Sequence, residues 1–397
     1  MTMHLLGNLS IDEFLRDYWQ QKPVLIRNAW PNFEPLLSAQ ELAGLSLEDD
    51  IESRLILEQG QDGPWEIRKG PFSETDYRSL PKSHWTLLIQ AIDHWVPEAA
   101  ELLEHFRFIP SWRIDDLMIS YAVDGGSVGP HYDQYDVFLL QAEGQREWRI
   151  GQHCDSNSPI IGNTRLRILS EFEETERWVL NPGDMLYLPP QLAHYGIAQG
   201  ECMTYSIGFR APSVSQLLET SLDVVLPTLT ENQRYCDAGI QPAVSASRID
   251  QQATERLANL LTSELQKPEV LAKILGQLMT EPKYSELLPE AENEITWDEW
   301  LDTVEGESLL RHEHARFAYF TDDNQCLFFN HGECTVLPKS CTQLVATLGD
   351  YRQYSIDQLQ HLALDDQGKN LLLQLWAQQM IYVESDTQGV FDGDCND

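Results

Sequence analysis

The sequence predicts an α+β protein with a β-rich centre, followed by a helical segment and a small α/β C-terminal part. Three observations predict this class. Between residues 117 and 209, short apolar runs alternate with Gly and Pro, which is typical of a β-sandwich or barrel. Residues 214–279 carry apolar side chains at helical spacing. From about residue 297, short strand patterns and helical patterns follow one another. We therefore expect three parts, covering residues 1–212, 213–290 and 291–397.

Composition favours a globular protein with an acidic surface. The chain has 397 residues, of which 42% are hydrophobic, and 27 Lys and Arg stand against 63 Asp and Glu, a net charge of −36. Such a surface argues against binding to nucleic acid or to anionic lipid, and it favours basic proteins or peptides as partners. The alternative is that the acidity serves solubility or reflects a salty habitat.

The seven cysteines are scattered and never spaced as Cys-x-x-Cys, so neither a disulfide framework nor a zinc finger is indicated. The N-terminal residues have no basic stretch followed by a long apolar run, and no segment has the length of a transmembrane helix. We expect a reduced, cytoplasmic protein without a signal peptide or membrane span.

The pattern of the first hundred residues predicts an α/β region without an identifiable functional motif. Ser10 followed three residues later by Glu13 is a capping-box signature, which predicts a helix from residue 11. The other predicted elements are a strand at 23–27, a helix at 38–45, strands at 54–57 and 65–68, and a helix at 85–96.

The central region reads as a series of short strands joined by turns. The predicted strands are 117–123, 137–141, 146–150, 177–180, 185–188, 196–198 and 203–209. Glu143 and Gly144 lie between two of these runs, and the pair predicts a hairpin turn.

The following segment is helical and rich in leucine, with predicted helices at 214–225, 253–263 and 270–279. We expect these helices to bury their leucines against a second copy of the chain, giving a homodimer. The alternative is that they pack on their own chain.

The pattern of the C-terminal part predicts a winged helix. The predicted strands are 317–320, 326–329 and 333–337, and the predicted helices are 343–349, 356–363 and 370–380. Winged helices often bind DNA, but acidic residues crowd the end of this one, and a phosphate-binding surface needs clustered Lys and Arg. Direct binding to nucleic acid is therefore not expected.

A candidate metal site lies in the central region, in the sequence GGSVGPHYDQYD at residues 125–136. Residues i and i+2 of a strand share a face, so a strand beginning near His131 would place His131 and Asp133 side by side, while Asp136 would point away. His194, after the turn Pro-Gly-Asp at 182–184, is the third candidate. Two histidines and one carboxylate form the facial triad of non-haem Fe(II) oxygenases. The alternatives are a buried histidine paired with a carboxylate, and a zinc site.

Arg146 supplies a cation fifteen residues after His131, on the predicted second strand of the hairpin. A 2-oxoglutarate cosubstrate chelates iron through its 2-oxo acid end and leaves a carboxylate that must be paired when buried, which an arginine does with two charge-assisted hydrogen bonds. Ser120 or Ser206 is the candidate for a second hydrogen bond. The alternative is a surface arginine paired with Glu147 or Glu143.

These residues resemble a known family. His131-x-Asp133, Arg146 and the run PGDMLYLP at 182–189 before His194 resemble the JmjC and cupin-like 2-oxoglutarate oxygenases. More narrowly, WRIDDLMIS at 112–120, GPHYDQYDVF at 129–138 and YSIGFRAP at 205–212 resemble the bacterial ribosomal oxygenases, which hydroxylate an arginine of protein sixteen of the large ribosomal subunit. The resemblance covers nearly the whole chain. It implies a JmjC domain built as a double-stranded β-helix, a helical dimerisation segment and a C-terminal winged helix.

The resemblance also implies roles for the site residues. His131, Asp133 and His194 would hold Fe(II), leaving positions for 2-oxoglutarate and O2, and Arg146 would bind the far carboxylate of 2-oxoglutarate.

For the substrate we expect negative charge and an aromatic wall around a guanidinium. The candidates are Asp115, Asp116 and Tyr135; their alternatives are a strand-end cap for the aspartates and core packing for the tyrosine. Rival functions are a histidine hydroxylase or N-methyl-lysine demethylase, or a non-catalytic cupin coupled to a winged helix that acts as a regulator. The aspartates favour a cationic target residue.

Overall fold

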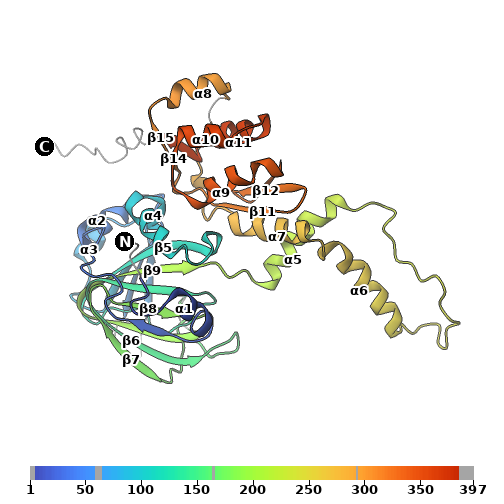
Figure 1. Ribbon diagram of the computed structural model, residues 1–397. Helices are drawn as coiled ribbons and strands as arrows, with labels where there is room; N and C mark the ends of the chain where they lie inside the picture. The colour runs from blue at the N-terminus through green and yellow to red at the C-terminus, as the bar shows by residue number, and fades with distance from the viewer. Residues whose placement is uncertain (1–4, 59–64, 163–165, 292–293, 384–397) are drawn as a thin grey trace. The chain divides into compact units, whose positions relative to one another are not determined.

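The computed structural model describes residues 5–58, 65–162, 166–291 and 294–383 (Figure 1). Contacts within the chain divide it into two compact units, Met1–Ala211 and Pro212–Asp397. The finer division of the second unit at residue 290 stays a prediction.

The first unit is built on a nine-stranded sheet of antiparallel pairs, in the order β1-β8-β6-β9-β5-β4-β2-β3, with β7 paired to β6. The strands are β1 (Val24–Ile26), β2 (Ser53–Glu58), β3 (Trp65–Lys69), β4 (Trp85–Ile89), β5 (Ile114–Ala122), β6 (Val137–His153), β7 (Glu176–Leu180), β8 (Met185–Leu188) and β9 (Leu192–Phe209). Apart from the strand expected to begin near His131, the strands predicted in this region are confirmed as parts of these, but several predicted short strands merge into the two long ones, β6 and β9.

The predicted hairpin at Glu143 and Gly144 is wrong, because β6 runs through these residues as one strand. Its register with β9 shifts on both sides of Glu143, as at a β-bulge. Gly144 has φ +63°, and a Cβ there would lie 2.1 Å from the carbonyl oxygen of Glu201. A glycine at positive φ serves a turn or a bulge equally well, so the sequence pair does not distinguish them. Arg146 therefore lies on the same strand as Val137.

Helices cover one face of this sheet and leave the other to the site. The helices are α1 (Ile11–Asp17), α2 (Ala39–Leu45), α3 (Glu74–Arg78) and α4 (Pro97–Leu103). Phe14 of α1 packs against Tyr187 of β8 at 5.0 Å between ring centroids, and Leu117 and Ile119 of β5 belong to the same core. Because side chains alternate along a strand, Met118 and Ser120 lie on the opposite face. The predicted capping box of Ser10 and Glu13 is confirmed.

The predicted helix at 85–96 is wrong. Its first half is β4, which pairs with both β2 and β5, and its second half is the short 3-10 helix η1 (Ile92–His94). Ala91 separates the two with φ +51°. A short apolar run is ambiguous between helix and buried strand, and here the pairing with two neighbouring strands decides.

The second unit begins with the helices α5 (Val214–Val225), α6 (Gln251–Leu265) and α7 (Pro268–Thr280), which confirm the predicted helices. α7 packs on its own chain, since a Cβ at Gly276 would lie 2.5 Å from the ring of Phe329. α5 packs beside α7 but leaves an apolar stripe exposed, formed by Val214, Leu218 and Leu222 and continued by Leu226 directly after the helix.

The rest of the second unit has two three-stranded sheets, β14-β10-β15 and β11-β12-β13, around a core that includes the fully buried Trp300. The strands are β10 (Ser308–Arg311), β11 (Phe317–Thr321), β12 (Gln325–Asn330), β13 (Glu333–Pro338), β14 (Gln353–Ser355) and β15 (Ile381–Val383), and the helices are α8 (Trp297–Val304), α9 (Thr342–Asp350), α10 (Ile356–Leu362) and α11 (Asp366–Ala377). The strands and helices predicted in this region are confirmed. Across the described residues of both units, no helix combines the length and apolar character needed to cross a membrane.

Candidate metal centre and neighbouring residues

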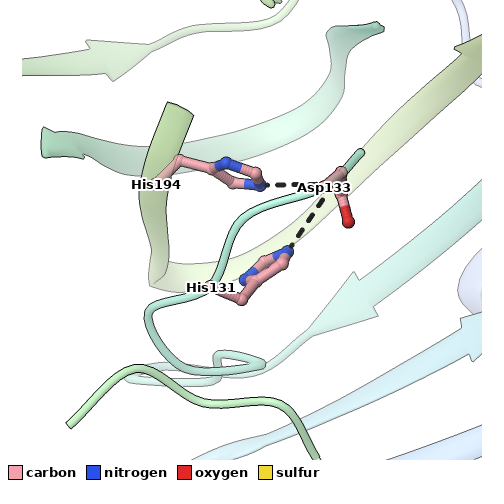
Figure 2. Close-up of side chains that lie close together, drawn as sticks. All are labelled: His131, Asp133 and His194. Atoms are coloured by element: carbon pink, nitrogen blue, oxygen red, sulfur yellow. Dashed lines mark ion pairs between the residues drawn. The ribbon is translucent and has the colours of Figure 1, made fainter. Parts of the chain in front are cut away.

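His131, Asp133 and His194 bring their ligand atoms within 4.8 Å of one another (Figure 2). Oδ2 of Asp133 lies 3.6 Å from Nε2 of His194 and 4.0 Å from Nε2 of His131. The two imidazole rings are 4.3 Å apart between centroids. Among the residues that the structure describes, this is the one group of three or more His, Cys, Asp or Glu side chains placed closely enough to hold a metal. The structure thus brings together the three residues that the sequence selected.

The backbone fixes these three residues, although not through the strand that was predicted. His131 and His194 form an isolated bridge, with N–H to O=C distances of 3.0 and 2.8 Å. The chain after His131 leaves the bridge as a loop, and the carbonyl of Asp133 accepts from the N–H of Gln191 at 2.7 Å. The expected strand from His131 to Asp133 is therefore wrong. Backbone bonds to the returning chain, rather than strand alternation, place Asp133 beside the histidines.

Each histidine is oriented by its other ring nitrogen. Nδ1 of His131 lies 2.9 Å from the carbonyl oxygen of Gly129, and Nδ1 of His194 lies 2.9 Å from that of Leu192. A carbonyl only accepts, so each Nδ1 carries the proton and each Nε2 offers its lone pair to the site. Burial lowers the pKa of His194 to about 4, which keeps this ligand neutral near pH 7. Two imidazole nitrogens and one carboxylate oxygen form a donor set that fits a divalent iron.

The segments that flank the ligands are held by close backbone packing and by buried carboxylates. A Cβ at Gly126 would lie 2.3 Å from the carbonyl oxygen of Trp85, so only glycine allows this approach. Asp184, in the turn before β8, accepts from the N–H of Asn28 at 2.8 Å and from Arg27 at 2.6 Å. The turn is thereby tied to the chain after β1.

Asp136, which strand alternation set apart from the ligands, is fully buried elsewhere. Its carboxylate accepts from the hydroxyl of Tyr187 at 2.6 Å and from Nε2 of Gln20 at 2.9 Å. Asp136 therefore joins β8 to the turn after α1, and it lies outside the metal cluster.

Arg146 is 6% exposed, and its guanidinium is only partly bonded. Nη1 donates to Oγ of Ser120 at 3.1 Å, while Nε and Nη2 are buried and have no hydrogen-bond partner in the described part of the chain. Two neighbouring N–H groups of a buried guanidinium fit one carboxylate. The surface alternative fails for Arg146 but describes Arg149, which pairs with Glu147 at 2.8 Å.

Trp148 lies between Arg146 and the metal cluster. Its ring is 5.9 Å from the Cζ of Arg146 and 5.9 Å from the ring of His194. Its indole N–H is also buried, again with no partner within the described residues. A Cβ at Gly196 would lie 2.7 Å from this ring, so glycine is needed there to seat it. Sequence reasoning missed Trp148, although its spacing of two from Arg146 already put both on one face of β6.

Of the two serines predicted to bind the cosubstrate, Ser120 contacts Arg146 and Ser206 lies farther along β9. Ser120 contacts Arg146 directly and also donates to the carbonyl of Thr204 at 3.2 Å. Ser206 lies on β9 opposite Met118, two residues from Gly208. Ser120 is therefore the serine placed to support Arg146, and Ser206 lies close to Gly208 along the chain.

Asp115, Asp116 and Tyr135 converge around Gly208 of β9. A Cβ built on Gly208 would lie 3.8 Å from Oδ1 of Asp116, 3.9 Å from Cε2 of Tyr135 and 4.0 Å from Cβ of Asp115. Tyr135 is 42% exposed. The negative charge of Asp133 first, then partial burial and the charges of Asp116 and Asp115, raise its pKa well above the usual value. The phenol therefore stays protonated among acidic side chains that include the metal ligand Asp133.

The two aspartates also have partners of their own. Asp115 pairs with Arg210 at 3.0 Å. Oδ2 of Asp116 accepts from Nε2 of Gln90 at 2.7 Å and from the N–H of Ala91 at 3.0 Å. Sequence reasoning missed Gln90 because it placed this residue in a helix, where its register against β5 could not be inferred.

Comparisons with known proteins agree with this architecture. Residues 101–217 match the model of a JmjC domain, and residues 259–382 match that of a ROXA-like winged helix. The chain is 36% identical over 316 residues to the ribosomal protein uL16 3-hydroxylase of Escherichia coli, covering 79% of this chain and 83% of that protein. It is 35% identical over 324 residues to a probable ribosomal oxygenase of Haemophilus influenzae, covering 80% and 78%.

Solved structures give the same result over almost the whole length. The structure of YcfD, a ribosomal oxygenase from E. coli in complex with cobalt and 2-oxoglutarate, matches with a TM-score of 0.81 and 31% identity, covering 95% of this chain and 99% of that one. The complex of YcfD with cobalt and succinic acid matches with a TM-score of 0.82. The predicted fold class, a JmjC/cupin core followed by a winged helix, is confirmed.

Proposed function

The chain belongs to the ribosomal oxygenase family, and we propose that it hydroxylates an arginine side chain of ribosomal protein uL16, using Fe(II), 2-oxoglutarate and O2. One observation carries the proposal. Trp148 lies close both to the cluster of two histidines and a carboxylate and to the buried Arg146. Two N–H groups of Arg146 have no hydrogen-bond partner among the described residues. That pairing suits a 2-oxo acid with a second carboxylate.

The protein side chains divide the work between metal and cosubstrate. His131, Asp133 and His194 would hold Fe(II), and three protein ligands leave positions open for other ligands. With 2-oxoglutarate and O2 bound, the iron supplies an oxidant able to hydroxylate an unactivated carbon. Arg146 would pair with the far carboxylate of 2-oxoglutarate and so fix the direction in which the cosubstrate lies. Ser120 would hold Arg146 in place.

We infer that the side chain of the substrate arginine binds beside Gly208, in a pocket lined by Asp116 and Tyr135. Tyr135 offers an aromatic ring and Asp116 a carboxylate oxygen beside Gly208. Asp115 lies next to them, with its carboxylate paired to Arg210. Tyr135 follows Asp133 by two residues, so a side chain bound there lies next to the metal ligands. The net charge of −36 favours the approach of a basic ribosomal protein.

The test is to incubate the purified protein with Fe(II), 2-oxoglutarate and uL16, and to map the product by mass spectrometry. We expect one added oxygen atom on one arginine, and none with Asp133→Asn, which keeps the shape of the ligand but weakens the site. Peptides with a histidine or an N-methyl-lysine at the same place test the rival targets. Modification of those residues with unmodified arginine would overturn the choice of substrate.

We also propose that the chain acts as a homodimer and without direct contact to nucleic acid, in the cytoplasm, where ribosomal proteins are made. The exposed stripe of α5 supports the dimer: Leu222, for instance, is 57% exposed on a helix whose neighbours α6 and α7 pack beside it. An apolar stripe of this kind calls for a covering partner. The helical segment at 213–290 would then be the dimerisation segment.

A further inference from the structure

We propose that Gln90 is a positioning residue for the substrate arginine, holding Asp116 in the orientation that faces the pocket, and that Arg54 in turn fixes the amide of Gln90. The inference rests on the proposed function, because it concerns the same pocket. It assigns to Gln90 and Arg54 an effect on the binding of the protein substrate alone.

The three side chains form a hydrogen-bonded row across neighbouring strands. Arg54 of β2 donates from Nη2 to Oε1 of Gln90 at 2.7 Å. Gln90, directly after β4, donates from Nε2 to Oδ2 of Asp116 on β5 at 2.7 Å. β4 lies between β2 and β5 in the sheet, so the row follows the order of the strands.

The chemistry of the row permits only one direction. A guanidinium has donors and no acceptor, so the amide of Gln90 must turn its oxygen to Arg54. Its NH2 group then faces Asp116, whose ionised carboxylate accepts and does not donate. Arg54 and Asp116 therefore select the same amide orientation from opposite sides, and the hydrogen bond from Arg54 strengthens the hold of Gln90 on Asp116.

This support determines where the carboxylate points. Gln90 and the N–H of Ala91 both bind Oδ2 of Asp116. The other oxygen, Oδ1, is the atom that lies 3.8 Å from the position of a Cβ on Gly208, on the side of Tyr135. A carboxylate already held toward the substrate loses little conformational freedom when a cation binds, which strengthens binding.

Two variants separate positioning from simple charge. Gln90→Glu has the same shape and keeps an acceptor for Arg54, but it replaces the donor to Asp116 by an acceptor and adds a negative charge to the pocket. If only charge mattered, this variant would bind a cationic substrate more tightly than wild type. If Gln90 positions Asp116, the variant binds the substrate more weakly. Gln90→Met removes the donor without adding charge. Gln145→Met is the matched control, because Gln145 bonds Asn181 at an exposed position.

The experiment measures kcat and KM for uL16, and the Kd for 2-oxoglutarate, for wild type and the three variants. We expect Gln90→Glu and Gln90→Met each to raise KM for uL16 about tenfold, the loss of roughly one charged hydrogen bond. We expect kcat and the Kd for 2-oxoglutarate to stay within about twofold of wild type, because neither residue reaches the metal cluster. Gln145→Met should match wild type throughout. If Gln90→Met does not fold, the isosteric Gln90→Glu still decides.

An unchanged KM in both Gln90 variants, or a lower KM in Gln90→Glu, would overturn the inference while leaving the proposed function in place. If wild type leaves the arginines of uL16 unmodified, the proposed function fails, and this inference with it.

Discussion

Replacing Arg146 by methionine should weaken the binding of 2-oxoglutarate by about a hundredfold or more. The side chain keeps most of its volume but loses Nε and Nη2, the two buried N–H groups without described partners. A hydrogen bond to a charged group contributes about 1.5–3 kcal/mol, so losing two corresponds to roughly 3–6 kcal/mol. Because about 1.4 kcal/mol is a tenfold change in affinity, Kd should rise at least about a hundredfold.

The same substitution should not destabilise the protein without cosubstrate. A buried guanidinium whose charge is not paired costs free energy, so Arg146→Met should unfold at the same temperature as wild type or at a higher one. The opposite results for binding and stability separate a cosubstrate residue from a structural one.

The assay is isothermal titration calorimetry with Mn(II) in place of Fe(II), which avoids turnover. Two ligands are compared: 2-oxoglutarate, and 2-oxopentanoate, which lacks the far carboxylate. Arg146→Met should bind 2-oxopentanoate as wild type does. Arg149→Met is the control, because that arginine is paired with Glu147 on the other face of β6. Wild-type affinity for 2-oxoglutarate in Arg146→Met, or equal losses for both ligands, would refute the reasoning.

Three further outcomes follow. Asp133→Asn should lose bound Fe(II) after dialysis, as measured by plasma mass spectrometry. It should also lose the stabilisation of about 2.7 kcal/mol that wild type gains when the metal concentration is a hundredfold above Kd. Asp136→Asn should keep the metal, and equal metal contents in the two variants would contradict the choice of ligands. Gly196→Ala should lower the free energy of unfolding in urea by about 1–3 kcal/mol, because its methyl group overlaps the ring of Trp148; wild-type stability would show that the ring moves freely. Leu222→Asp should sediment as a monomer where wild type sediments as a dimer, and a monomeric wild type would rule out the homodimer.

The sequence predicts most of the fold because most of its signals are local. The capping box of Ser10 and Glu13 determines the start of α1, and the turn residues separate the strands. The errors arise where a long-range pairing decides. Gly144 allows a bulge as well as a turn, and only the register of β6 with β9 shows which one forms. The apolar run of β4 becomes a strand because β2 and β5 lie on either side of it.

The candidate site was likewise predictable where its signals are local and not where they depend on the folded backbone. The ligand types and their spacing are visible in the sequence, and the structure brings His131, Asp133 and His194 together. The partners that orient them are not visible: the carbonyls of Gly129 and Leu192 that fix the imidazoles depend on the local backbone path. Gln90 was hidden for the same reason as β4, because its role depends on the strand beside it.

The fate of labelled dioxygen is the decisive test of the proposed hydroxylation. The purified protein is incubated with Fe(II), 2-oxoglutarate and uL16 under isotopically labelled O2, and both uL16 and succinate are measured. We predict one labelled oxygen atom on an arginine of uL16 and one succinate molecule formed for each arginine hydroxylated. Unmodified arginines, or an added oxygen that comes from water, would contradict it.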